Sequence, residues 1–248
     1  MHAKRPVRLL CLDFDGVICD SANECMLVTY DAYFDVDHVH TEALPTAYCE
    51  VFKRYRYLVR DPGEYYLLAN AYDEGRTIDE ARFTAVVAGA SSACREFKQK
   101  FFAARRALRR KDERAWVNLH SAYEHVVEFM KTATAPIDII TTKDEESVDA
   151  LLTAYGVREK VGRIFGQQAL TAHGGKAGAI RVAVARRGLE PSEVAYLDDH
   201  LKHLADVRDT GVHLWHATWG YTDPEVQETP AYVRALAMNR VHAMLEAG

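Results

Sequence analysis

Short runs of apolar, β-branched residues alternate with helical stripes over the second half of the chain, and this alternation restricts the fold more than any other feature. Each stripe repeats apolar residues at three- and four-residue steps and ends near a glycine, which is typical of an amphipathic helix. Strand and helix in alternation predict right-handed crossovers and a parallel sheet. The expected strands are Val7–Leu12, Ile137–Thr141, Val161–Phe165, Val194–Leu197 and Val212–Trp215.

The stretch between the first two expected strands, residues 21–131, has no convincing strand and several helical stripes. Two stripes predict helices that bury one face, and they consist of Phe97, Phe101, Ala104 and Leu108 and of Trp116, Leu119, Tyr123, Val126 and Met130. Short linkers, Cys19–Asn23 and Thr132–Pro136, bracket this stretch. The sequence therefore predicts an α/β core domain with a doubly wound parallel sheet of five strands, residues 1–20 and 132–248, and an inserted all-helical domain, residues 21–131. A last stripe, Val233, Ala237, Val241 and Met244, predicts a helix that closes one side of the sheet.

Composition narrows the classes of function. With 31 Lys+Arg and 36 Asp+Glu, the net charge of −5 does not support binding to nucleic acid through an overall basic surface, and no nucleic-acid partner is expected. No segment approaches the roughly 20 apolar residues that span a bilayer, so no membrane partner is expected. The five cysteines are odd in number and form no CxxC pair, which is typical of a reducing compartment. We expect a cytoplasmic protein, and the oligomeric state stays open.

Polar side chains follow the expected strands at the points where the strands end. In an open parallel sheet these ends meet at one edge, and ligands bind beyond it. We therefore expect carboxylates, a hydroxyl and an ammonium to converge there. The segments are Asp13-Phe14-Asp15-Gly16 after the first strand, Thr141-Thr142-Lys143 after the second, Gly174-Gly175-Lys176 after the third, and Asp198-Asp199 after the fourth.

This set of side chains suits phosphoryl transfer. Converging carboxylates repel each other unless a cation joins them, and oxygen ligands without a nearby Cys or His favour Mg²⁺. The cation and Lys176 would neutralise the phosphoryl oxygens, to which the Thr141 hydroxyl would donate a hydrogen bond. Asp13 can attack phosphorus, while Asp15 can protonate the leaving oxygen and then deprotonate water. Gly16 lets the chain turn sharply close to the ligand.

The four motifs, in this order, resemble those of the haloacid dehalogenase superfamily: Asp13-Phe14-Asp15-Gly16-Val17, Thr141 after an apolar strand, Lys176, and Asp198-Asp199. The resemblance covers residues 1–20 and 132–248. It implies that Asp13 is the nucleophile and a metal ligand, and that Asp15 is the acid and base with its main-chain carbonyl on Mg²⁺. It implies that Thr141 and Lys176 hold the phosphate, and that the helical insertion is a cap of the first type, which opens for exchange and closes to exclude water.

Within this family the residues favour a Mg²⁺-dependent phosphatase that acts on a small phosphomonoester. Dehalogenases lack an acid like Asp15, and phosphonate hydrolases have a small residue at its position. A sugar phosphomutase is an alternative, because residues 15–21, Asp-Gly-Val-Ile-Cys-Asp-Ser, also resemble the opening of β-phosphoglucomutases. A second alternative is a non-catalytic protein that binds a partner through the basic surface of the insertion.

The fourth motif departs from the family pattern, which has Gly-Asp and another acid four or five residues later. Here Asp198 and Asp199 are followed by Lys202 and His203. Both aspartates are candidate metal ligands. The number of residues counted from the expected strand favours Asp198, and the number counted back from Gly211 favours Asp199. Thr142, a candidate substrate-binding residue together with Gly16, stands where the family often has Asn.

Residues of the insertion are the candidates for substrate selectivity. Arg60, beside Tyr65 and Tyr66, is expected on a loop that faces the active site. A basic run is expected to lie on the exposed sides of a helix, and it consists of Lys98, Lys100, Arg105, Arg106, Arg109, Arg110, Lys111 and Arg114. The histidines of the core are not expected to form a four-ligand zinc site, and they are His200, His203, His213 and His216.

Overall fold

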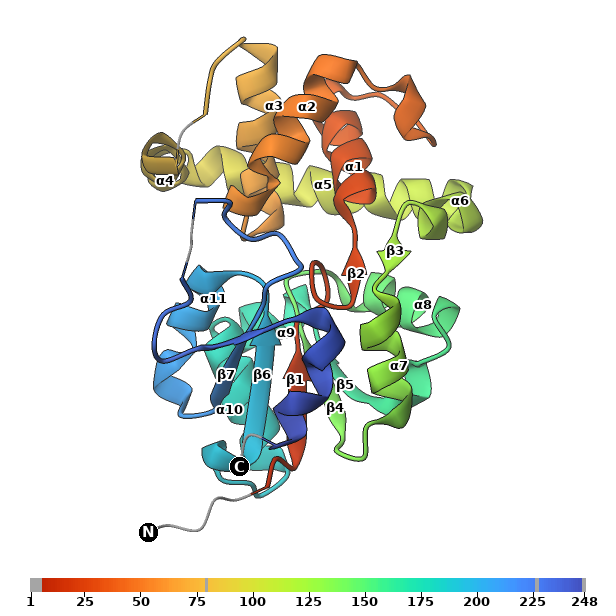
Figure 1. The fold of residues 1–248 in the computed structure, drawn as a ribbon. Coiled ribbons are helices and arrows are strands. Elements are labelled where there is room, and N and C mark those ends of the chain that lie inside the picture. The colour runs from red at the N-terminus through yellow and green to blue at the C-terminus, as the bar shows by residue number, and fades with distance from the viewer. Residues whose placement is uncertain (1–5, 79, 226–227, 247–248) are drawn as a thin grey trace. The chain divides into compact units, whose positions relative to one another are not determined.

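The chain divides into two units in the computed structural model, which describes residues 6–78, 80–225 and 228–246. The first, called here the α/β unit, comprises Met1–Asp20 and Ala122–Gly248. The second, called the helical unit, comprises Ser21–Ser121. Figure 1 shows the sheet of the α/β unit and the helices of the helical unit. No helix in the described part of the chain is long and apolar enough to cross a membrane.

A parallel sheet of six strands forms the centre of the α/β unit, in the order β5-β4-β1-β6-β7-β8. The central strand β1 is hydrogen-bonded to β4 and β6 in parallel, and all of its residues are buried, as expected for a strand that is covered on both faces. The strands are β1 (Leu9–Leu12), β4 (Ile137–Ile140), β5 (Val161–Phe165), β6 (Val194–Asp198), β7 (His213–Ala217) and β8 (Arg234–Leu236).

The sixth strand corrects the prediction of five. The stripe from Val233 to Met244 predicts one helix, but the chain instead adds β8 in parallel to β7 and continues as the 3-10 segment η7 (Met238–Glu246), which has a kink at Arg240. Val233, Val241 and Met244 of the stripe are buried, at most 6% exposed, whereas Ala237 is exposed. Pairing with the edge of β7 satisfies backbone groups that a helix would have left open on that strand.

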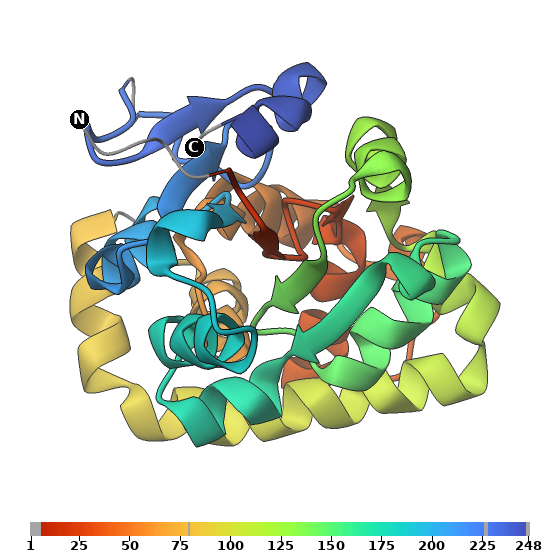
Figure 2. The same cartoon turned by 90° about the horizontal axis from the view of Figure 1, so that it is seen from below.

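Helices cover both faces of this sheet. One face carries a core that β1, β6 and β7 share with α9, α10 and α11. Figure 2 shows α7 and η7 on the side of the sheet opposite α10. The helices of the α/β unit are α7 (Glu124–Thr132), α8 (Glu145–Ala154), α9 (Gln167–His173), α10 (Lys176–Arg186) and α11 (Leu201–Asp206), with 3-10 turns η4 (Arg158–Lys160), η5 (Pro191–Glu193) and η6 (Arg208–Thr210).

The stripe from Trp116 to Met130 does not form one helix. It is divided into α6 (Glu113–Asn118) and α7, and the short strand β3 (Ser121–Ala122) between them pairs with β2 (Cys19–Asp20). The Tyr123 N–H donates to Ile18 O at 2.9 Å, so the chain is extended where helical periodicity predicts a turn. The α/β unit thus begins again at Ala122, and α7, which the sequence assigns to the insertion, packs on η7 through Phe129 and His242.

The helical unit is built around α5, whose apolar stripe is buried at Phe97, Phe101 and Leu108. Tyr65 is 3% exposed and stacks between Phe52 and Phe101, so its ring belongs to the interior of this unit rather than to an exposed loop. The helices are α1 (Ala22–Phe34), α2 (Thr46–Tyr55), α3 (Tyr65–Asp73), α4 (Glu80–Gly89), α5 (Ser91–Lys111) and α6, with 3-10 turns η1 (Thr41–Ala43), η2 (Arg56–Leu58) and η3 (Pro62–Glu64).

Arg105 is an exception to the exposed basic face that the sequence predicts for α5. Its side chain is 2% exposed, and the guanidinium donates to both carboxylate oxygens of Glu24 on α1, at 2.6 and 2.8 Å. Trp116 Nε1 donates to the same carboxylate at 3.3 Å. A buried arginine requires such a partner, because an unpaired charge in an apolar interior is strongly unfavourable.

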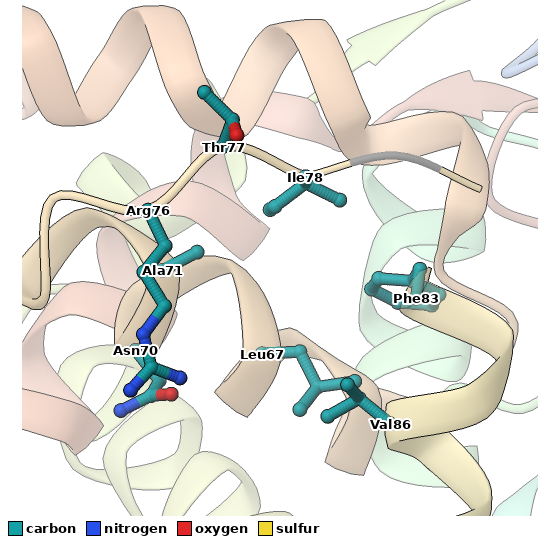
Figure 3. A pocket seen from close by; sticks show the side chains of 8 residues that line it. All are labelled: Leu67, Asn70, Ala71, Arg76, Thr77, Ile78, Phe83 and Val86. Carbon is teal, nitrogen blue, oxygen red and sulfur yellow. The ribbon is translucent and has the colours of Figure 1, made fainter. Parts of the chain in front are cut away.

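The helical unit also contains a small, mainly apolar cavity of about 70 Å³. In Figure 3 the side chains of Leu67, Ile78, Phe83 and Val86 surround the opening, and the Arg76 guanidinium lies next to Asn70. None of the described residues that line the cavity is acidic.

Candidate active site

The carboxyl ends of β1, β4 and β6 meet in the middle of the sheet. The strand order reverses at β1, since β4 and β5 follow on one side and β6, β7 and β8 on the other. Open α/β sheets bind ligands at such a switch point. Asp13 follows β1 directly, Thr141 follows β4, and Asp198 is the last residue of β6. The sheet therefore supplies three polar side chains at this edge.

Lys176 joins two carboxylates of this cluster. Gly174 and Gly175 have positive φ angles of 75° and 97°, which glycine adopts without strain, and they turn the chain from α9 so that α10 begins at Lys176. The Lys176 ammonium lies 2.9 Å from Asp13 Oδ2 and 2.7 Å from Asp198 Oδ2. All three side chains are buried. The Lys176 ammonium that the sequence predicts for this edge of the sheet thus contacts two of the predicted carboxylates, those of Asp13 and Asp198.

Burial and charge act in opposite directions on the pKa values of this cluster. Burial raises the pKa of the Asp13 carboxyl, and the Lys176 charge offsets this only in part. Burial also opposes ionisation of Asp198, but there the Lys176 charge prevails and holds the pKa of the carboxyl well below its usual range. Burial works against the charge of Lys176, and the two carboxylates outweigh it and raise its pKa. Lys176 and Asp198 are therefore the firmly ionised pair.

The two carboxylate oxygens of Asp13 differ in their contacts. Its Oδ2 contacts Lys176, while its Oδ1 is buried and has no hydrogen-bond partner among the residues that the structure describes. A buried carboxylate oxygen without a partner is unfavourable and uncommon in folded proteins. The orphaned Oδ1 is what a ligand or a reacting atom would satisfy.

Asp15 is paired with a lysine to which the sequence assigns no role. Lys143 Nζ lies 3.1 Å from Asp15 Oδ1, and the Lys143 side chain is fully buried. The Lys143 N–H also donates to Thr141 Oγ1 at 3.2 Å. The motifs point to Lys176 as the positive side chain, whereas Lys143 lies two positions after Thr141, which follows the second strand directly. The signal that could have found Lys143 is Asp15, a partly buried carboxylate near the neighbouring strand end, which favours a positive partner.

The Asp199 carboxylate lies against two glycines. A Cβ at Gly16, whose φ is +81°, would lie 2.0 Å from Asp199 Oδ2, and a Cβ at Gly220 would lie 2.5 Å from the same oxygen. This oxygen accepts from the Tyr221 N–H at 2.6 Å, and His216 Nε2 donates to Asp199 O at 3.1 Å. The requirement for glycine at position 16 thus comes from the close approach of Asp199 as well as from the backbone angle.

His203 brings a nitrogen to the cluster, whereas the sequence predicts oxygen ligands without a nearby Cys or His. It is the third residue of α11, and its Nδ1 lies 3.4 Å from Asp198 Oδ1. One ligand atom each from Asp13, Asp198 and His203 lies within 4.8 Å of the others. Side chains in the first turn of a helix lean toward its N-terminus. For this reason the His203 side chain lies near the carboxyl end of β6, the strand that precedes α11.

Thr142 and Arg60, the other predicted substrate-binding residues, stay predictions. Thr142 is half-buried beside Thr141. Arg60 belongs to the helical unit, where its N–H donates to Glu64 Oε2 at 2.7 Å and its guanidinium lies 3.8 Å from Glu64 Oε1.

A family model for haloacid dehalogenase-like hydrolases matches residues 7–205. The chain belongs to this family. The matched residues include every strand end described above and the whole helical unit. A comparison of the sequence with curated proteins found no match.

Solved structures similar to this haloacid dehalogenase-like hydrolase share its fold at low sequence identity. One is described as a predicted phosphoglycolate phosphatase from Haemophilus somnus 129pt, with 17% identity, a TM-score of 0.64, and coverage of 94% of this chain and 95% of that one. Another is a predicted phosphatase from Clostridium acetobutylicum, with 13% identity, a TM-score of 0.59, and 96% and 97% coverage. A third, from Geobacter sulfurreducens, is a family hydrolase of subfamily IA, with 13% identity, a TM-score of 0.57, and 99% and 100% coverage.

The donor set of this haloacid dehalogenase-like hydrolase fits a divalent cation. Two buried carboxylates converge, and one of their oxygens, Asp13 Oδ1, has no hydrogen-bond partner in the described residues. Lys176 supplies one positive charge to the pair. A metal ion would satisfy the orphaned oxygen and add positive charge where a phosphoryl group would bind.

Proposed function

We propose that this hydrolase removes the phosphoryl group from a small phosphomonoester through an aspartyl phosphate on Asp13. The state of the Asp13 carboxylate carries the proposal: Lys176 holds Oδ2, and Oδ1 is buried without a hydrogen bond among the described residues. A carboxylate held at one oxygen and available at the other is oriented for attack. The predicted phosphatases among the similar structures support the same reaction class.

In the first step, a carboxylate oxygen of Asp13 forms a bond to phosphorus while the bond from phosphorus to the ester oxygen breaks. The leaving oxygen takes the proton of the Asp15 carboxyl group. In the second step, water loses a proton to the Asp15 carboxylate and attacks phosphorus. The bond between phosphorus and Asp13 then breaks, which releases phosphate and restores both side chains.

Two further residues would stabilise the transferring group. Lys176 already lies 2.9 Å from Asp13 Oδ2, so its charge acts where negative charge develops on the phosphoryl oxygens. The Thr141 hydroxyl oxygen accepts a hydrogen bond from the Lys143 N–H, which leaves its own hydrogen to donate to a phosphoryl oxygen. Thr142, Gly16 and Arg60 stay proposed contacts of the substrate.

The metal proposed for this reaction is a divalent cation, with Mg²⁺ as the family's expectation. Asp13, Asp198 or Asp199, and the main-chain carbonyl of Asp15 would hold it. When bound, it would neutralise charge on the phosphoryl oxygens. The helical unit is proposed as the cap that selects the substrate. We also propose a cytoplasmic location, because the structure has its five cysteines as thiols rather than as disulfides.

The test is release of inorganic phosphate from a panel of phosphomonoesters that includes 2-phosphoglycolate, sugar phosphates and nucleoside monophosphates. With Mg²⁺ or Mn²⁺ present, the wild type should hydrolyse at least one, and Asp13→Asn should lose at least about 10³-fold in kcat. Asp209→Asn, the same change at an exposed position of the α/β unit, should keep full activity. Full activity of Asp13→Asn would contradict the mechanism.

The panel also separates the alternatives. A sugar phosphomutase would convert one isomer of a sugar phosphate into another and release little inorganic phosphate. A non-catalytic binding protein would release none from any compound and would be isolated together with a partner.

A further inference from the structure

His203 places an imidazole nitrogen at the edge of the Asp13–Asp198 cluster. The side chain is 14% exposed, and its Nδ1 is buried without a hydrogen bond to any residue that the structure describes. It lies 3.4 Å from Asp198 Oδ1, too far and too poorly aligned for a hydrogen bond of ordinary strength. Two buried polar atoms in this cluster, Asp13 Oδ1 and His203 Nδ1, are thus left without partners of their own.

The same three residues can bind one ion. Donor atoms of Asp13, Asp198 and His203 all lie within 4.8 Å of one another, so these residues could hold a single metal ion. They are the one group of three potential ligands of this kind in the described part of the chain. Lys176 contacts the Oδ2 atoms of both aspartates, which helps to hold the two carboxylates in place.

The nitrogen changes which ion the site suits. Mg²⁺ is a hard cation that prefers oxygen ligands and gives up its water reluctantly, whereas imidazole suits the first-row transition metals. The usual acid of the fourth motif would have kept the ligand set all oxygen, and in this chain Lys202 and His203 follow instead.

We propose that His203 is a metal ligand and that it makes this site selective for a first-row transition-metal ion over Mg²⁺. The inference depends on the proposed function only for the location of the cation. It concerns the identity of the ion, and it holds whichever phosphomonoester is the substrate.

The test compares the affinities for Co²⁺ and Mg²⁺ by calorimetry in the wild type, His203→Asp and His203→Gln. His203→Asp restores an acid and should tighten Mg²⁺ binding relative to Co²⁺. The ratio of the two affinities should fall at least about tenfold, because changing even the outer partners of a metal costs about 10- to 100-fold in affinity. His203→Gln, which adds no negative charge beside Asp198, should weaken Co²⁺ binding by a similar factor.

A spectroscopic readout identifies the ligand directly. The visible absorption of bound Co²⁺ should change in position and intensity when the imidazole is lost, in both variants. His125→Asp, the same substitution at an exposed position of α7, should leave the spectrum and the affinity ratio as in the wild type. Thermal unfolding without metal should show that each variant is folded.

Three results would overturn the inference: no Co²⁺ binding by the wild type, an affinity ratio that is equal in the wild type and His203→Asp, or a Co²⁺ spectrum that does not change. In each case His203 would instead be a neighbour of Asp198 that binds no metal. The proposed function is judged separately by phosphate release. Selective Co²⁺ binding without hydrolysis would leave the inference standing and reject the function, and hydrolysis with an unchanged ratio would do the reverse.

Discussion

Lys143 and Asp15 form an ion pair of 3.1 Å at the ends of adjacent strands, with the lysine side chain fully removed from solvent. Asp15 is the proposed acid and base, so we expect Lys143 to orient the group that moves protons. In this mechanism Lys143 would be a positioning residue, because it would act on the reaction through Asp15.

Lys143→Met should reduce kcat by about 10- to 100-fold, within the usual contribution of a positioned acid or base. It should also move the alkaline limb of the kcat/KM profile to higher pH, because Asp15 donates the proton of the first step and loses the positive charge that favours its ionised form. Steady-state kinetics from pH 4.5 to 9 measure both effects. Lys143→Arg should recover part of the rate. A profile that keeps its position in Lys143→Met would mean that the lysine only supports the fold.

Gly16→Ala should lower kcat/KM by about 100-fold, the cost of a displacement of roughly 1 Å in an active site. The new Cβ would lie 2.0 Å from Asp199 Oδ2, so the carboxylate or the turn has to move. Gly188→Ala is a matched control, because its φ of +59° imposes similar backbone strain and no atom lies within 4 Å of the added Cβ. It should lose about 1–2 kcal/mol of stability and keep its activity. Equal losses of activity in the two variants would contradict the role given to Asp199.

His216 should make the free energy of unfolding rise with pH on the acidic side of neutrality. Burial lowers its pKa, although a hydrogen bond to the Asp199 carbonyl acts in the other direction. Below about pH 6.5 the unfolded histidine takes up a proton that the folded one refuses. Stability therefore increases as pH rises from the folded pKa to about 6.5, and this contribution is constant at higher pH.

Denaturant unfolding at pH 5 to 8 with EDTA measures this dependence. His216→Gln should show a shallower slope below pH 6.5 than the wild type, while His125→Gln, at an exposed position, should follow the wild type. Parallel curves for the wild type and His216→Gln would show that another group is responsible.

Arg105→Met should lower the free energy of unfolding by about 3–5 kcal/mol, because the buried Glu24 carboxylate loses its guanidinium. Arg106→Met, at the next and exposed position of α5, should change it by less than about 0.5 kcal/mol. Adding Glu24→Gln to Arg105→Met should recover part of the loss, since no uncompensated charge then remains. Urea denaturation of the four proteins gives these values. A similar loss in both arginine variants would rule out the buried pair as the cause.

The ends of the strands were predictable because they follow from period and composition. A buried parallel strand such as Leu9–Leu12 reads as a continuous apolar run, and the first polar residue after it marks the edge of the sheet. Asp13 and Asp198 could therefore be assigned to one edge before the structure was known. The strand β8 could not be predicted. It has three residues, of which only Leu236 is buried, and so short a segment has no periodicity that distinguishes a strand from a helix.

Contacts that depend on the direction of a long side chain were harder to predict. Lys143 and His203 lie two and five positions beyond Thr141 and Asp198, and the sequence assigns neither of them a role in the site. Their proposed roles depend on which way a loop and a first helical turn direct their side chains. The sequence predicts an exposed Arg105 because charged side chains are usually exposed. Its burial depends on the ion pair with Glu24, a residue far away in the sequence.

The central place of β1 has a consequence during synthesis. Its Leu-Leu-Cys-Leu segment is made before its two neighbours, Ile137–Ile140 and Val194–Asp198, which follow only after the whole helical unit. Until then an apolar strand has both edges open, which is the condition that favours aggregation. The nascent protein should therefore depend on chaperones while the helical unit is being made, and a fragment that stops before residue 194 should be insoluble.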